Sequence, residues 1–338
     1  MVLDIWKKIK KGDIAPVYLL YGTEAFLINE TKQLLLSQLL HEDEKDFNHT
    51  AYDLEETPIE VAIEDAETFP FLGEKKVIFL HNPQFLTSEK TKEKIDHNLT
   101  RFEAYIKEPA PYTVMVISAP YDKLDERKKI TKELKRTAAV VEAKKLNENE
   151  LKSWVKERAK GYGIEIEPGA LERLLTLAGT NMFMLTSEID KLALYAQDEK
   201  IIQTHLVEKL VSRTIEQNIF TLIEKVVARR LDEALRIYFD LLKQNEEPIK
   251  ILALLSGQFR LIYQVKELSR RGYGQQQIAG YLKTHPFRVK LALGQADKFT
   301  DEELTNLMNL LAEADYQMKT GGMNKSLLIE MLLFRMKK

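Results

Sequence analysis

The sequence predicts an α/β domain at its N-terminal end, followed by a region that is helical to the end of the chain. Five short segments rich in β-formers alternate with helical stretches in the first 145 residues, and the strongest of them are continuously apolar. Strands buried on both faces read as unbroken apolar runs, so this pattern favours a parallel sheet with helices on both sides. After Val141 the strand signal fades and helical periodicity replaces it.

The expected elements of the first 145 residues alternate in type. Gly22 ends the first strand, and Pro58 stands where the first turn of a helix tolerates proline. The expected strands are 17–21, 47–54, 76–80, 113–117 and 138–142. The expected helices are 26–40, the helix that Pro58 begins, and segments around 88–107 and 125–136. This alternation suits a parallel sheet, because each parallel connection needs a crossover.

The remainder of the chain reads as two helical regions. Residues 146–211 carry four expected helices, at 147–160, 168–177, 181–197 and 205–211. Asn147, with Glu150 three residues later, predicts a capping box at the start of the first of them. From Ser212 onward the pattern is helical with short joints. The expected domains are therefore 1–145, 146–211 and 212–338.

The composition is that of a globular protein and excludes several kinds of site. The 338 residues include no cysteine, which rules out disulfides, thiolate nucleophiles and cysteine-ligated metals. The net charge is −2, although residues 212–338 hold 20 basic against 15 acidic side chains. The near-neutral total charge disfavours a protein whose main role is to coat nucleic acid. The sequence shows neither a secretory signal nor an apolar run near 18 residues, so a cytoplasmic protein without membrane contact is expected.

A strand that runs into Gly22 and then into a helix has the topology of a P-loop. A working loop reads G-x-x-x-x-G-K-[ST], because its glycines let backbone N–H groups surround phosphate while the lysine balances the charge. Counting from Gly22, those last three positions hold Leu27, Ile28 and Asn29. Two bulky apolar residues stand where phosphate should lie and no cation is present, so the loop is predicted to be degenerate.

The magnesium half of a nucleotide site is missing as well. A strand such as 113–117 should lead to an acidic pair, and it leads instead to Ser118, Ala119 and Pro120, with Asp122 alone beyond the proline. The histidines form no i, i+4 pair, and neither a G-x-S-x-G nor a G-x-G-x-x-G motif occurs. We expect no catalytic residue, no metal site and no cofactor. An active ATPase with an unusual loop stays open as an alternative.

Seven islands of sequence, in order along nearly the full chain, point to one family. They read PVYLLYGTEAFLINE, ETFPFLGEKKVIFL, KLDERKKITKEL, SEIDKLALY, EEPIKILALLSGQFRLIY, THPFRVKLALGQADKF and ADYQMKTG. No single island is specific, but their order is. The chain resembles the delta subunit of the bacterial DNA polymerase III clamp loader.

The resemblance implies an AAA+-like α/β domain with a degenerate P-loop, a small helical lid domain and a C-terminal helical collar domain. It implies a non-catalytic subunit of the DNA polymerase III holoenzyme, which binds the sliding clamp (the beta subunit) and opens it for loading onto primed DNA without hydrolysing ATP. The collar would join the other clamp-loader subunits, of the gamma/tau and delta-prime types. An inactive P-loop-type adaptor or scaffold of another assembly stays open as the alternative, and clamp binding separates the two.

An apolar cluster between a helix and the third strand is the candidate site. Phe69, Phe71 and Leu72 are interrupted by Pro70 and followed by Gly73, so a helix cannot bury all three on one face. From the residues alone, the cluster is either the lip of the core or an exposed anchor.

The resemblance implies that Phe71 and Leu72 enter an apolar cleft on the clamp. Phe69 is expected in the core, and Lys75 and Lys76 are candidate rim contacts.

One helix of the C-terminal region shows an apolar face. Its members are Leu252, Leu255, Phe259 and Ile262, and we expect most of them in the core of their own domain. Gln258 and Arg260 point elsewhere on this helix, where they could face a neighbouring subunit or DNA.

Overall fold

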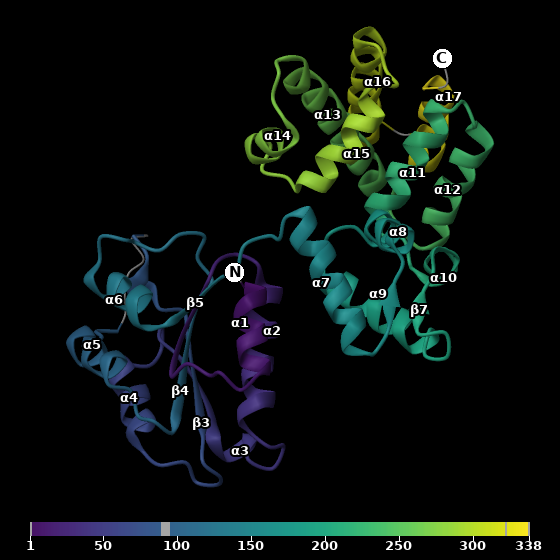
Figure 1. The fold of residues 1–338 in the computed structure, drawn as a ribbon. Coiled ribbons are helices and arrows are strands. Elements are labelled where there is room, and N and C mark those ends of the chain that lie inside the picture. Colours follow the sequence, from purple (N-terminus) through teal and green to yellow (C-terminus); the bar gives the residue numbers. More distant parts are fainter. Residues whose placement is uncertain (1, 89–94, 322, 337–338) are drawn as a thin grey trace. The chain divides into compact units, whose positions relative to one another are not determined.

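The structure is a computed structural model that describes residues 2–88, 95–321 and 323–336. It falls into two compact units, Met1–Lys145 and Leu146–Lys338. Figure 1 shows a sheet with helices in the first unit and mostly helices in the second. The division into three domains stays a prediction.

The first unit is built on a five-stranded sheet with the order β2-β3-β4-β1-β5, in which every pairing is parallel. Its strands are β1 Val17–Tyr21, β2 His49–Asp53, β3 Lys76–His81, β4 Thr113–Ala119 and β5 Ala139–Glu142. In the centre, the register sets Leu19 beside Ile117 and Ile78 beside Met115. The predicted α/β domain with a parallel sheet is confirmed.

Helices cover both faces of this sheet (Figure 1). They are α1 Val2–Lys10, α2 Ala25–Leu39, α3 Lys45–Asn48, α4 Ile59–Glu67, α5 Leu99–Lys107 and α6 Lys129–Thr137, with a 3-10 helix η1 at Gln84–Leu86. Side chains of α4, α5 and α6 bury Leu19 and Ile78 on one face. On the other side, the Trp6 indole N–H of α1 donates to the Thr31 hydroxyl of α2 at 2.8 Å. Apolar residues on both faces are thereby removed from water, as the unbroken strands require.

The structure of this unit differs from the expected elements in three places. Helix α1 has no counterpart among the expected elements. The segment expected to be extended from residue 47 begins as the short helix α3, and the strand starts at His49. The helix expected around 88–107 begins only at Leu99, where the Asn98 side chain accepts the N–H of Arg101 and caps the first turn. Residues 89–94 of that expectation lie outside the described residues.

The second unit is helical apart from a two-stranded parallel sheet, β6 Glu165–Ile166 with β7 Ile201–Ile202. Asn147 and Glu150 form the predicted capping box at the start of α7. The helices are α7 Glu148–Gly161, α8 Pro168–Ala178, α9 Met182–Tyr195, α10 Thr204–Leu210, α11 Ile215–Val227, α12 Leu231–Lys243, α13 Pro248–Arg270, α14 Gln275–Tyr281, α15 Pro286–Ala296, α16 Asp301–Thr320 and α17 Lys325–Arg335. The small sheet was missed because two-residue strands are too short to show a period.

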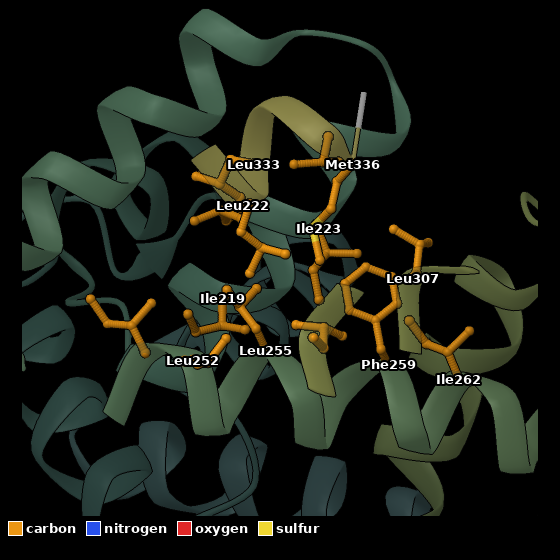
Figure 2. Packing of buried hydrophobic residues seen from close by; sticks show 14 of the residues in the cluster. Ile219, Leu222, Ile223, Leu252, Leu255, Phe259, Ile262, Leu307, Leu333 and Met336 are labelled. Carbon is orange, nitrogen blue, oxygen red and sulfur yellow. The ribbon is translucent and has the colours of Figure 1, made fainter. Parts of the chain in front are cut away.

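Helix α13 runs through the core of the C-terminal helices, and Figure 2 shows its inner side chains meeting those of α11. The predicted core residues Leu252, Leu255, Phe259 and Ile262 are all buried, which confirms that face of the helix. Gln258 is half-buried, and its side-chain N–H donates to the buried Gln295 at 2.9 Å. Within the described ranges, no helix combines the length and apolar character needed to cross a membrane.

Candidate functional site

The loop between α4 and β3 displays apolar side chains to solvent. Phe69 is 79% exposed, Phe71 76% and Leu72 40%. Gly73 then adopts a φ of +64°, a left-handed conformation that glycine reaches without a steric penalty. Large apolar side chains rarely gather on an exposed loop without a partner, so the anchor alternative of the sequence analysis is favoured over the lip of the core.

A buried amide supports this loop from inside. Asn48, at the end of α3, accepts the N–H of Phe71 at 2.9 Å and that of Leu72 at 3.4 Å through its Oδ1 atom. Its Nδ2 atom donates to the carbonyl oxygen of Leu72. Phe47, the preceding residue, is 55% exposed and stacks on Phe71, with ring centroids 5.4 Å apart. Neither residue was found from the sequence, because they lie more than 20 residues from the loop and nothing in the pattern links the two segments.

Phe69 was expected in the core, and this prediction is wrong. Helix α4 ends at Glu67, and Thr68 takes an extended conformation that directs the chain away from the helix axis. The Phe69 ring therefore lies on the surface against Tyr112, with centroids 4.7 Å apart. The Tyr112 hydroxyl in turn donates to the Glu67 carbonyl at 2.7 Å.

The two candidate rim lysines have different surroundings. Lys76 is only 5% exposed, and its ammonium donates to the Asp65 carboxylate at 2.9 Å and the Thr68 hydroxyl at 2.7 Å. It joins the end of α4 to the start of β3, and a buried, paired ammonium of this kind argues against a rim contact. Lys75 is half-buried and donates to the Pro111 carbonyl at 2.9 Å, and its rim role stays a prediction.

The loop after β1 is closed by the protein itself. The N–H of Gly22 donates to the Ala119 carbonyl at 3.2 Å, and the N–H of Glu24 donates to the Ala143 carbonyl at 2.9 Å. In a working P-loop, such N–H groups point at phosphate. Leu27 and Ile28 are buried, at 0% and 4% exposure. Two backbone donors of this loop are thus bonded within the protein, and the residues at the glycine and lysine positions of the P-loop pattern are buried.

The surroundings of β4 complete this comparison with a nucleotide site. The strand ends at Ala119, and Asp122 is exposed beyond it. Among the described residues, no three His, Asp or Glu side chains are arranged to hold a metal ion.

A buried basic cluster lies between α2 and the strands β2 and β3. Burial lowers the pKa of Lys32 to about 8, and its ammonium lies 3.3 Å from Nδ1 of His81. Burial, with the Lys32 charge as a second cause, also lowers the pKa of His49 and of His81. The Lys32 ammonium lies 5.5 Å from the centre of the Phe79 ring, which favours a cation over its face. Lys32 is buried and both histidines are half-buried, so desolvation disfavours the charged form of each group.

Comparison with known proteins identifies the family. Residues 18–144 match the family model for the DNA polymerase III delta subunit, and residues 216–336 match the model for its C-terminal domain. Residues 147–209 match a model described as a middle domain. The DNA polymerase III subunit delta of Bacillus subtilis (strain 168) is 51% identical over 338 residues, which cover 100% of this chain and 97% of the relative. The chain belongs to the DNA polymerase III delta subunit family.

Two further relatives agree with this assignment. A probable DNA polymerase III subunit delta of Aquifex aeolicus (strain VF5) is 26% identical over 260 residues, covering 76% of this chain and 72% of the relative. The solved structure of the Bacillus subtilis DNA clamp loader delta protein superposes with a TM-score of 0.78 at 50% identity, covering 100% of this chain and 99% of that chain. The predicted family is confirmed, and the chain is a homologue of a clamp-loader subunit that functions in DNA replication.

Proposed function

We propose that this chain binds the sliding clamp with Phe71 and Leu72 and holds the ring open for loading onto primed DNA. The observation that carries the proposal is the outward display of both side chains from a loop whose backbone is hydrogen-bonded from within. Exposed apolar clusters mark interaction sites on soluble proteins. Family membership supports the sliding clamp as the partner and disfavours the adaptor alternative, since the similar chains are delta subunits over nearly their full length.

The energy available from this pair is sufficient to matter. Burying a Phe and a Leu side chain would contribute roughly 3 to 6 kcal/mol before costs. Association loses translational and side-chain freedom, so only part of that energy appears as affinity. Removal of the pair should still weaken binding by about a hundred-fold, which corresponds to roughly 2.7 kcal/mol.

The experiment is a titration of purified sliding clamp with the full-length protein and with the variant Phe71→Ala/Leu72→Ala. We expect about a hundred-fold weaker binding. Fluorophores placed across one subunit interface of the clamp report ring opening in the same titration, and opening should be lost in parallel. Equal affinity of the variant and the original protein would contradict the proposal.

A matched control comes from the second unit. Phe183 and Met184 form another adjacent pair of exposed apolar residues, on α9. The variant Phe183→Ala/Met184→Ala removes a similar apolar surface and should keep the original clamp affinity. A similar loss in both variants would show that general surface hydrophobicity, and not this loop, governs binding.

We infer that the chain neither binds nor hydrolyses ATP by itself. The support is the loop after β1, where protein carbonyls accept the N–H groups of Gly22 and Glu24, and the full burial of Leu27 at the start of α2. Millimolar Mg-ATP should leave the melting temperature unchanged, because a ligand that binds the folded state raises it by mass action. Saturable binding that disappears when residues 22–29 are altered would revive an active ATPase.

The C-terminal helices are proposed to join other clamp-loader subunits of the gamma/tau and delta-prime types. Leu327, Met331 and Phe334 are exposed at i, i+4 and i+7 on α17, so they form one apolar stripe. The substitution Met331→Asp places a charge in that stripe and should reduce co-purification of the other subunits with the full-length chain. Clamp binding by the same variant should be unaffected, and undiminished co-purification would count against this surface.

A further inference from the structure

The loop that carries Phe71 and Leu72 is held by a segment far from it in the sequence, residues 44–48. Asn48 is fully buried, and its one side chain satisfies three backbone groups, the N–H of Phe71 and both the N–H and the carbonyl of Leu72. An amide suits this task because it accepts through oxygen and donates through nitrogen. A carboxylate would leave the Leu72 carbonyl without a donor, and alanine would leave all three groups without a partner.

The neighbours of Asn48 act on the same loop. Phe47 stacks on Phe71, and because it is itself half-exposed, it continues the apolar surface beyond the pair. A β-carbon on Gly73 would run into the Glu44 carboxylate, which accepts the His41 N–H at 2.9 Å through its other oxygen. The segment therefore contacts the loop at its aromatic ring, its backbone and its final turn.

Such an arrangement reduces the cost of binding. An unsupported loop loses conformational freedom when its side chains are captured, and this loss subtracts from affinity. Hydrogen bonds from a buried side chain remove that freedom in advance. They also pair the backbone polar groups of the loop, which would be costly if they were left unpaired at an apolar interface.

We propose that Asn48 is the positioning residue of the clamp-binding loop, and that Phe47 belongs to the surface covered by the apolar cleft of the clamp. This inference rests on the proposed function of Phe71 and Leu72 as the anchor. The clamp-binding surface and its support then come from two segments. The second, residues 44–48, cannot be found by searching the sequence for exposed apolar pairs.

The test measures clamp affinity and loop order in the full-length protein. Asn48→Ala should weaken clamp binding about ten-fold, which corresponds to roughly 1.4 kcal/mol. Chymotrypsin should also cut the Phe71–Leu72 bond several times faster in this variant under native conditions. Phe47→Ala, a substitution at an exposed position, should weaken binding by about three-fold or more while the protein stays folded, so the test stands even if Asn48→Ala folds poorly.

Thr31→Val is the matched control for a lost buried hydrogen bond. Thr31 is fully buried on α2, accepts from Trp6 and donates to the Leu27 carbonyl. This variant should lose stability while clamp affinity and cleavage at residue 71 stay unchanged. An equal loss of affinity in Thr31→Val and Asn48→Ala would overturn the inference, since both would then act through stability.

The outcomes separate this inference from the proposed function. If Phe71→Ala/Leu72→Ala abolishes binding while Asn48→Ala and Phe47→Ala keep the original affinity, the inference fails and the anchor stands. If the double variant itself binds normally, the proposed function fails.

Discussion

Two loops of the first unit satisfy their backbone hydrogen bonds in different ways. The loop after β1 uses its own backbone donors on the carbonyls of Ala119 and Ala143, and Leu27 is buried on the helix that follows it. The loop before β3 has its backbone satisfied by a buried side chain, Asn48, and turns Phe71 outward. The first directs backbone donors to carbonyls of the protein, and the second displays apolar surface.

The difference teaches that the destination of backbone hydrogen bonds decides what a loop can bind. Every buried N–H needs a hydrogen-bond acceptor. A loop whose N–H groups donate to carbonyls within the protein cannot donate them to phosphate. A loop whose N–H groups are satisfied from beneath can present apolar side chains to a partner. The proposed function therefore combines a loop that does not bind nucleotide with a second loop on the same sheet that binds a protein partner.

Truncation of Leu27 should separate the two loops most strongly. Leu27→Ala removes a fully buried side chain and should lower the free energy of unfolding by about 2 to 5 kcal/mol in urea denaturation. Phe71→Ala/Leu72→Ala should change it by less than about 1 kcal/mol, because these side chains are exposed. Clamp affinity should show the reverse order. Equal destabilisation by the two changes would remove the distinction between a closed and a displayed loop.

The buried Lys32 of α2 gives a smaller and pH-dependent effect. The pKa of Lys32 falls from 10.5 in the unfolded chain to about 8 in the folded unit, so between these pH values the unfolded state binds more protons. Stability should therefore rise with pH through that window. Lys32→Met should raise the free energy of unfolding at pH 7 by about 2 kcal/mol and flatten the rise above pH 8. A Lys32→Met variant less stable than the original protein at pH 7 would show that contacts with His81 and Phe79 outweigh desolvation.

Much of the fold follows from the sequence, because the strands are continuous apolar runs and the helices carry clear periods and caps. Asn147 with Glu150 marks a helix start that the structure reproduces. Short elements escape this reasoning. The strands β6 and β7 are two residues long, and α3 is four residues long and overlaps the start of the segment 47–54 that was expected to be extended.

The candidate site could be predicted less completely from the sequence than the fold. Local sequence shows that Phe69, Phe71 and Leu72 cannot share one helix face, but not which of them is exposed. The exposure of Phe69 and the burial of Lys76 depend on where α4 ends and on contacts with Tyr112 and Asp65. The support from Asn48 arises from tertiary packing across 23 residues of chain, which no local pattern records.

The most direct measurement of the central claim is a photo-cross-linking experiment in the full-length protein with the sliding clamp. A photoreactive phenylalanine analogue replaces Phe71 in one sample and Phe183 in another. Position 71 should give cross-links to the apolar cleft of the clamp, and position 183 should give none. A clamp complex that forms in full but yields no cross-link from position 71 would contradict it.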